Sequence, residues 1–575
     1  MDNAQIAQAF KTLADLLELQ GADPFRVRSY QNVARTLESL TESLADLAQE
    51  GRLRQIKGVG ESTAKKITEM LETGTLRALE EAREQFPPAL LDVLEVPGMG
   101  PKRTKLVYEQ LAVDSVTALE HAARQQKLRD LEGFGAKSEE NVLRGIELYY
   151  QGRERALLGD VWSLAQEIAD ELRAVKGVTA ASAAGSLRRG CETIGDIDIL
   201  VSAKNGPAIT KAFTALAQVQ EVVAAGDTKA TAYVAGNRQV DVRVVPPASW
   251  GAALMYFTGS KAHNIALRTR AVKDHQKLNE YGLFEVQNGR EKRLAGKTEA
   301  EVYKALGLAY IEPELREEQG EIEAALKGTL PRLITLEDIH GDLHMHTVAS
   351  DGHNTLEEMV DACAARGYAY MAISEHSKSL VIGNGLSVER LREEMRKIRE
   401  LAEQRDDIAI FCSSETDILP DGSLDWPDEV LADLDVVMAS VHSGFTRDVE
   451  RMTKRVIRAL ETERIDVLCH PTGRLIGRRE AYGLDIEAVI EAAAKTNTAL
   501  ELNCSPERLD LKDTHCHMAK EAGVKVCLGT DAHSTGMLDH ILFGVLTARR
   551  GWLERSDVVN AMSVGEFRKW LQRRR

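Results

Sequence analysis

The feature that most constrains the fold lies beyond residue 340, where short apolar runs alternate with helical stretches. The runs are YMAIS, IAIFCSS, DVVMASVH, IDVLCH, TALELNCS and VKVCLGT. Strand and helix patterns that alternate in this way predict parallel strands covered by helices, and about seven repeats favour a barrel. Histidine and acidic residues stand at the ends of these runs, where barrels of this kind place their active sites.

Histidine is concentrated in the same region, since all but three of the 14 histidines stand at residue 340 or later. Imidazole and carboxylate groups without thiolates suit Zn²⁺, Mn²⁺ or Fe²⁺ in a hydrolytic centre. One such histidine alone is more often a hydrogen-bonded structural residue, but a series at successive strand ends favours metal binding. The side chains in question are His344, His346, Asp351, His376, Glu415, His442, His470, Asp531 and His533.

Residues 1–150 have apolar side chains at helical spacing and are punctuated by three glycine hairpins, IKGVGES, VPGMGPK and LEGFGAK. A glycine turn that opens a helix presents free N–H groups to a phosphate. A single hairpin is better explained as a corner between helices, but a threefold repeat indicates binding of the DNA backbone. The glycines concerned in the first two are Gly58, Gly60, Gly98 and Gly100.

The segment from about residue 178 has a mixed α/β pattern, with the strand-like runs GDIDILVSA and QVDVRVV. Asp196 and Asp198 are two residues apart, so a strand directs both carboxylates to one face. Asp241 adds a third carboxylate if the two strands pair. Three carboxylates suit two Mg²⁺ or Mn²⁺ ions and phosphoryl transfer. The alternative is an acidic strand that faces water.

Composition excludes several classes of protein. The 575 residues include 43% hydrophobic residues but no run long enough to span a membrane, and the start MDNAQIAQAF lacks the pattern of a secretory signal. Seven cysteines without a CxxC pair predict reduced thiols and a cytoplasmic protein, associated with the nucleoid when on DNA. The net charge of −16 restricts DNA binding to local surfaces.

The motifs GSLRRG, GDIDIL, VDVRVV, YFTGSKAHN and LNEYGLF occur in one order that resembles the family X DNA polymerases, typified by DNA polymerase beta. The resemblance covers residues 1 to about 315 and implies that Asp196 and Asp198 hold both metals while Asp241 holds the catalytic one. It also implies a nucleotide site made of Gly185, Ser186, Arg189, Gly195, Tyr256, Phe257, Gly259 and Asn264, with Arg268 on the template. Lys261, His263 and Gln239 depart from the animal enzymes.

The first two hairpins resemble the helix-hairpin-helix motifs that flank a DNA gap in this family, which implies gapped or nicked DNA and dNTPs as partners. Lys66 matches the lysine that forms a Schiff base with a deoxyribose phosphate, although Ser62 replaces a neighbouring lysine. A lyase activity of Lys66 and a plain phosphate contact both remain open.

The histidine pattern resembles the polymerase and histidinol phosphatase domain, a distorted (β/α)7 barrel that follows the polymerase core in bacterial members. The resemblance implies that the nine residues above bind up to three Mn²⁺, Zn²⁺ or Fe²⁺ ions, with Glu415 as a bridge. Glu375 replaces the usual aspartate before His376.

We therefore expect a monomeric, multidomain protein with a helical N-terminal region, a nucleotidyltransferase palm and a C-terminal barrel. The expected ranges are 1–85 and 86–155 for two helical DNA-binding parts, 156–255 for the palm, 256–318 for the part that binds the nascent base pair, 319–336 for a linker and 337–575 for the phosphoesterase. The expected function is gap-filling DNA synthesis in repair with 3′-5′ exonuclease activity. The alternatives are a phosphoesterase with a vestigial nucleotidyltransferase fold and a DNA-end-binding scaffold.

Overall fold

The computed structural model describes residues 3–38, 44–49, 51–56, 58–73, 75–83, 85–87, 89–96, 98–236, 238–287 and 290–573. The chain forms two compact units. The first comprises Met1–Glu154 with the short segments Gly352–Thr355 and Leu475–Glu480, and the second comprises the remainder. No helix in the described ranges combines the length and the apolar character needed to cross a membrane.

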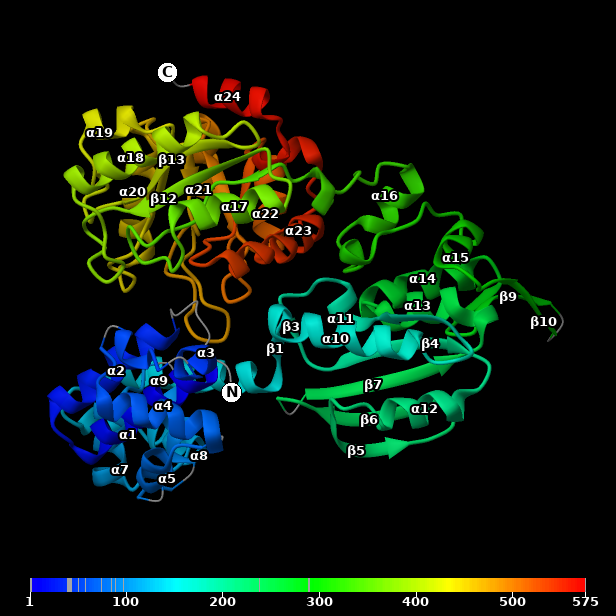
Figure 1. The fold of residues 1–575 in the computed structure, drawn as a ribbon. Coiled ribbons are helices and arrows are strands. Elements are labelled where there is room, and N and C mark those ends of the chain that lie inside the picture. Colours follow the sequence, from blue (N-terminus) through cyan, green and yellow to red (C-terminus); the bar gives the residue numbers. More distant parts are fainter. Residues whose placement is uncertain are drawn as a thin grey trace. The chain divides into compact units, whose positions relative to one another are not determined.

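The main part of the first unit is helical (Figure 1). Its α-helices are α1 (Asn3–Gln20), α2 (Pro24–Glu38), α3 (Leu44–Gln49), α4 (Glu61–Thr73), α5 (Arg77–Arg83), α6 (Leu90–Glu95), α7 (Pro101–Leu111), α8 (Val116–Arg124) and α9 (Ala136–Glu154). Two hydrophobic clusters, one around Phe10 and Leu13 and one around Val93 and Leu119, form its cores. The helical spacing seen in the sequence arises from these buried faces.

The palm begins the second unit and is built on a five-stranded sheet of order β2-β4-β7-β6-β5. Its elements are β1 (Ala156–Leu157), α10 (Leu158–Arg173), β2 (Val178–Ala183), α11 (Gly185–Arg188), β3 (Thr193–Ile194), β4 (Ile197–Ala203), α12 (Gly206–Thr214), β5 (Val219–Ala225), β6 (Lys229–Val234) and β7 (Arg238–Val245). Strands β4 and β7 are parallel neighbours, whereas the other pairs in this sheet are antiparallel. Helix α10 packs on β2 and β4, and α12 packs on β5, β6 and β7.

The next part of the second unit consists of helices and a three-stranded antiparallel sheet. Its elements are α13 (Trp250–Thr258), α14 (Lys261–Lys273), β8 (Gln276–Asn279), β9 (Gly282–Gln287), β10 (Arg290–Ala295), α15 (Glu299–Ala305) and α16 (Glu321–Lys327). A buried cluster around Met255, Leu267, Leu283 and Tyr303 holds these elements together.

Seven parallel strands in sequential order form the C-terminal region. They are β11 (Gly341–Asp342), β12 (Tyr370–His376), β13 (Ala409–Asp417), β14 (Val436–Ser440), β15 (Val467–Leu468), β16 (Ala499–Asn503) and β17 (Val526–Gly529). A parallel bridge between Met345 and Ala532 joins the first and last strands beyond their ends, so the barrel is nearly closed. The barrel expected from the alternating runs is confirmed.

Helices surround these strands (Figure 1). They are α17 (Leu356–Ala365), α18 (Val388–Glu403), α19 (Asp428–Asp433), α20 (Val449–Leu460), α21 (Ile486–Thr496), α22 (Asp513–Glu521), α23 (Ile541–Arg550) and α24 (Val564–Gln572). Met371 and Ile373 of β12 belong to one hydrophobic cluster, and Tyr370 of the same strand belongs to another, in which its ring stacks on Phe567 of α24 with centroids 4.7 Å apart. This alternation separates the two faces of each strand.

Candidate metal centres

The carboxylate cluster of the palm results from the register of β4 and β7. Asp198 and Asp241 are direct partners across this parallel pair, and Asp196 stands just before β4. One carboxylate oxygen from each residue lies within 4.8 Å of the other two. Gly185 has a φ of +60°, and a Cβ there would collide with the Asp198 carboxylate, so only glycine allows this approach. The structure thus brings the three predicted aspartates together.

The cluster is electrostatically unbalanced. Burial, together with the negative charges of Asp196 and Asp241, raises the pKa of Asp198 to about 7. The Nζ of Lys229 lies 3.4 Å from Asp241, and Gln239 Nε2 donates a hydrogen bond of 3.5 Å to the same carboxylate. Gln239 therefore contacts Asp241 without adding a positive charge. Oxygen donors in this number and proximity fit a hard divalent cation.

The GSLRRG motif forms the short helix α11 and the turn after it. Arg188 forms a bidentate pair with Glu299 at 2.7 and 2.8 Å, and burial of Glu299 is outweighed by Arg188 and Arg316, which lower the pKa of Glu299 to about 2. The pair with Glu299 therefore gives Arg188 a structural role. Arg189 donates hydrogen bonds to the Thr258 carbonyl and to Glu317. Both arginines reach the YFTGS turn, because Arg188 Nη1 also donates to Thr258 Oγ1 at 2.7 Å.

The residues predicted to face the nucleotide differ in their exposure. Tyr256 and Phe257 are half-buried at the end of α13, with their rings edge to face. Asn264 donates a hydrogen bond of 2.7 Å to the Tyr256 carbonyl, so it supports that turn. Lys261 and Arg268 are exposed on α14. Ser186 is half-buried, and Gly195 is exposed immediately before the first aspartate.

His263, which departs from the animal enzymes, belongs to the core. It is fully buried, and its ring nitrogens lie 2.6 Å from Glu321 and 2.9 Å from the Tyr303 hydroxyl. Burial lowers the pKa of His263. This side chain ties α14 to α15 and α16.

Each glycine hairpin of the first unit directly precedes a helix. Gly58 and Gly98 have φ values of +83° and +88°, and α4 and α7 begin directly after Gly60 and Gly100. The free N–H groups of both helix starts are therefore adjacent to the turns. Lys66 lies one turn into α4, and its Nζ donates to Ser62 Oγ at 3.2 Å.

The barrel gathers the nine predicted ligands at the carboxyl ends of its strands. Glu415 of β13 is the central acid: its oxygens lie 2.8 Å from His376 and His470 and 3.4 Å from His442. Asp531 lies 3.4 and 3.3 Å from His344 and His346. Asp351 lies 3.4 Å from both His376 and His533.

This donor set fits metal ions. Both ring nitrogens of His346 and Nε2 of His344 are buried and have no hydrogen-bond partner in the described residues. Burial and the neighbouring rings of His376 and His533 lower the pKa of His346 to about 3, so its imidazole is neutral, as a ligand must be. Buried nitrogens left without partners are costly unless a cation uses them. Burial and Glu501 raise the pKa of Cys469, which keeps the adjacent sulfur a thiol.

Three further acids support these ligands, and of them the sequence singled out only Glu375. Glu501 of β16 accepts a hydrogen bond of 2.5 Å from His344 Nδ1, which directs Nε2 toward Asp531. Asp417 contacts His442 Nδ1 at 3.0 Å. Glu375 accepts hydrogen bonds from Thr347 and Ser350 and so fixes the segment before Asp351. An acidic residue inside an apolar strand, as in TALELNCS, was the available signal for Glu501.

Comparison with known proteins shows the family of the chain. Over its full 575 residues the chain is 38% identical to the DNA polymerase/3′-5′ exonuclease PolX of Bacillus subtilis (strain 168), and the match covers 100% of both chains. The chain belongs to the bacterial PolX family of family X DNA polymerases. Family descriptions match this PolX-type chain in order: helix-hairpin-helix domain (1–76), SAM-like helix-hairpin-helix tandem (90–147), DNA polymerase beta palm (159–245), DNA polymerase beta thumb (253–317) and PHP domain (342–505).

Two further relatives match separate parts of this PolX-type chain. DNA polymerase lambda of Rattus norvegicus is 25% identical over 342 residues, which cover 55% of the chain and 56% of the relative. A probable phosphatase of Caldanaerobacter subterraneus subsp. tengcongensis is 30% identical over 204 residues, or 33% of the chain and 75% of the relative. The family resemblance drawn from the motifs and the expected fold class are both confirmed.

Proposed function

We propose that the chain is a DNA-directed DNA polymerase that fills gaps during DNA repair and carries a metal-dependent 3′-5′ exonuclease in its barrel. The observation that carries the synthetic activity is the parallel register that sets Asp198 opposite Asp241 beside Asp196. Full-length similarity to a bacterial PolX supports both activities in one chain.

In the polymerase site we propose that the three aspartates hold two Mg²⁺ or Mn²⁺ ions. Such ions, when bound, neutralise the charge that develops during in-line phosphoryl transfer. Asp241 would receive support from Gln239, and it stands nearest the primer hydroxyl in this proposal. Gly185, Ser186, Arg189 and Gly195 would contact the triphosphate. Tyr256, Phe257, Gly259 and Asn264 would border the sugar and base, and Arg268 the template.

In the barrel we propose that the nine clustered ligands hold up to three Mn²⁺, Zn²⁺ or Fe²⁺ ions with Glu415 as a bridge. Glu501 and Asp417 would orient His344 and His442 by accepting hydrogen bonds from their second ring nitrogens. Metals of this type supply hydroxide near neutral pH for phosphodiester hydrolysis.

The hairpin glycines and the helices that they open would bind gapped or nicked DNA through backbone N–H groups. We propose the domain ranges given by the sequence, dNTPs as substrates, a monomeric state and a cytoplasmic location near the nucleoid. Lys66, which is half-buried on α4 beside Ser62, could add a deoxyribose-phosphate lyase activity.

A 5′-labelled gapped duplex incubated with Mn²⁺, with and without dNTPs, tests both activities. Extension with dNTPs and shortening without them are expected. Replacing Asp196 and Asp198 with alanine should abolish extension and leave shortening, whereas replacing His344 and His346 should do the reverse. Hydrolysis without any extension would favour a phosphoesterase with a vestigial nucleotidyltransferase fold, and tight gap binding without either reaction would favour a scaffold.

A further inference from the structure

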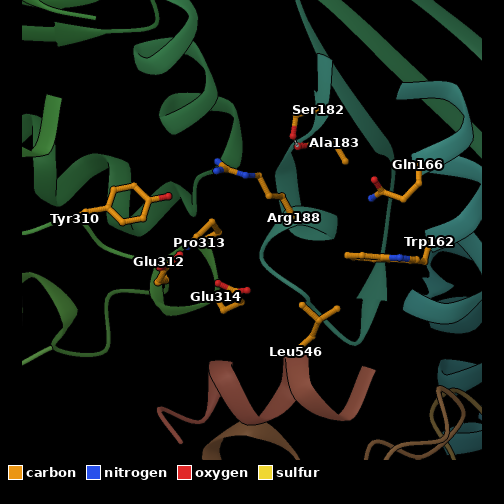
Figure 2. A pocket seen from close by; sticks show the side chains of 10 residues that line it. All are labelled: Trp162, Gln166, Ser182, Ala183, Arg188, Tyr310, Glu312, Pro313, Glu314 and Leu546. Carbon is orange, nitrogen blue, oxygen red and sulfur yellow. Dashed lines mark hydrogen bonds between the residues drawn. The ribbon is translucent and has the colours of Figure 1, made fainter. Parts of the chain in front are cut away.

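Helix α23 of the barrel region packs against the palm turn that carries Arg189. The ring of Phe543 lies edge to face with Trp162 of α10, with centroids 6.3 Å apart. Leu546 is so near Gly190 that a Cβ on this glycine would come within 3.1 Å of it. Figure 2 shows Leu546 on the wall of a cavity of about 270 Å³ that Arg188 and Glu314 also line. The phosphoesterase region therefore contacts the nucleotide-binding turn.

Arg550, at the end of α23, is held in a fixed orientation. Its Nε and Nη2 lie 2.9 and 2.8 Å from Asp513 at the start of α22. The third nitrogen, Nη1, donates to the carbonyl of Arg189 in the palm at 3.0 Å and to Oε1 of Glu317, in the part that follows the palm, at 2.8 Å. A planar guanidinium fixed on one edge presents its other edge with little freedom.

Glu317 Oε1 also accepts a hydrogen bond of 2.9 Å from Nε of Arg189, so one oxygen joins both arginines. The side chains of Arg189, Arg550 and Glu317 are only 14%, 12% and 20% exposed. Although burial alone would raise it, the two arginines hold the pKa of Glu317 below its usual range. With Asp513, two carboxylates balance two guanidinium groups.

We propose that Arg550 is a positioning residue for the incoming nucleotide: by sharing Glu317, it leaves Arg189 available to the triphosphate. This inference rests on the proposed role of Arg189. Without Arg550, Glu317 pairs with Arg189 alone and the cluster carries a surplus negative charge, which opposes a triphosphate. Because the primer and the aspartates are not involved, nucleotide affinity changes and the chemical step does not.

The test measures steady-state dNTP addition by the full chain with Mn²⁺. Arg550→Gln should raise the KM for dNTP about tenfold, the size of one charge-assisted hydrogen bond, with kcat changed less than about twofold. Arg549→Gln is the matched control, because Arg549 is the preceding residue of α23 and pairs with Glu314 at 2.7 Å. The KM of this control should equal that of the parent. Shortening of the 3′ end reports an intact barrel in every variant.

Adding Glu317→Gln to Arg550→Gln removes the surplus charge and should return the KM to within about threefold of the parent, and Arg550→Lys should do the same by keeping the positive charge. An unchanged KM in Arg550→Gln, an equal rise in Arg549→Gln, or no recovery in the double variant would overturn the proposal. Arg189→Gln distinguishes a failure of the role proposed for Arg550 from a failure of the role proposed for Arg189. If Arg189→Gln leaves the KM for dNTP unchanged, the proposal that Arg189 binds the nucleotide is wrong.

Discussion

Asp198 should destabilise the metal-free protein, and Asp198→Asn should therefore stabilise it while abolishing synthesis. A rise in the pKa of a carboxyl group from 3.8 to about 7 corresponds to about 4 kcal/mol, since each tenfold change in proton affinity is worth about 1.4 kcal/mol. Asp198 is half-buried, and solvent screening reduces this value, so we expect about 2 kcal/mol at pH 8.

Proton binding by Asp198 determines how the stability of the protein changes with pH. Between about pH 4 and pH 7 the folded protein keeps a proton on Asp198 that the unfolded chain has lost, so stability falls as pH rises through this window. The asparagine variant has no such proton. The difference in the free energy of unfolding between this variant and the parent should therefore depend on pH. At pH 5 it should be roughly a third of its final value, and at pH 8 it should reach that value.

Urea unfolding with EDTA at pH 5, 6, 7 and 8, followed by tryptophan emission, measures the difference. Asp406→Asn, which neutralises an exposed carboxylate between α18 and β13, is the control and should show no pH-dependent gain. Mn²⁺ at pH 8 should stabilise the parent more than Asp198→Asn. A difference between Asp198→Asn and the parent that stays constant from pH 5 to pH 8 would refute the electrostatic reasoning.

Three further predictions concern other parts of the chain. Glu501→Gln should weaken activation of 3′ shortening by Mn²⁺ about 10- to 100-fold through loss of the His344 orientation, with dNTP addition unchanged; a normal Mn²⁺ titration would contradict this. Gly98→Ala should weaken gapped-DNA binding about fivefold in fluorescence anisotropy, because a Cβ at positive φ costs roughly 1 kcal/mol, and equal affinity would argue against the hairpin. If Lys66 is a lyase nucleophile, Lys66→Ala should lose borohydride trapping on a 5′-deoxyribose phosphate while Lys65→Ala keeps it; trapping that persists without Lys66 excludes that role.

Local periodicity predicted the barrel, the helical N-terminal region and the carboxylate pair, because each depends on residues close together in the sequence. The pairing of Asp198 with Asp241 needed one further assumption, that two strands become neighbours. Glu501 was hidden because an acidic residue in an apolar run reads as part of a strand surface. The contact between Arg550 and Glu317 spans 233 positions and arises from the packing of whole domains, which no sequence pattern encodes.

The barrel is joined at its seam through Met345 and Ala532, the residues that stand between His344 and His346 and between Asp531 and His533. The bridge that closes the ring therefore also places Asp531 and His533 beside His344 and His346. If these residues bind metal as proposed, a nascent chain that lacks Asp531 and His533 lacks part of the site, and we expect it not to shorten DNA until its last strand has been added.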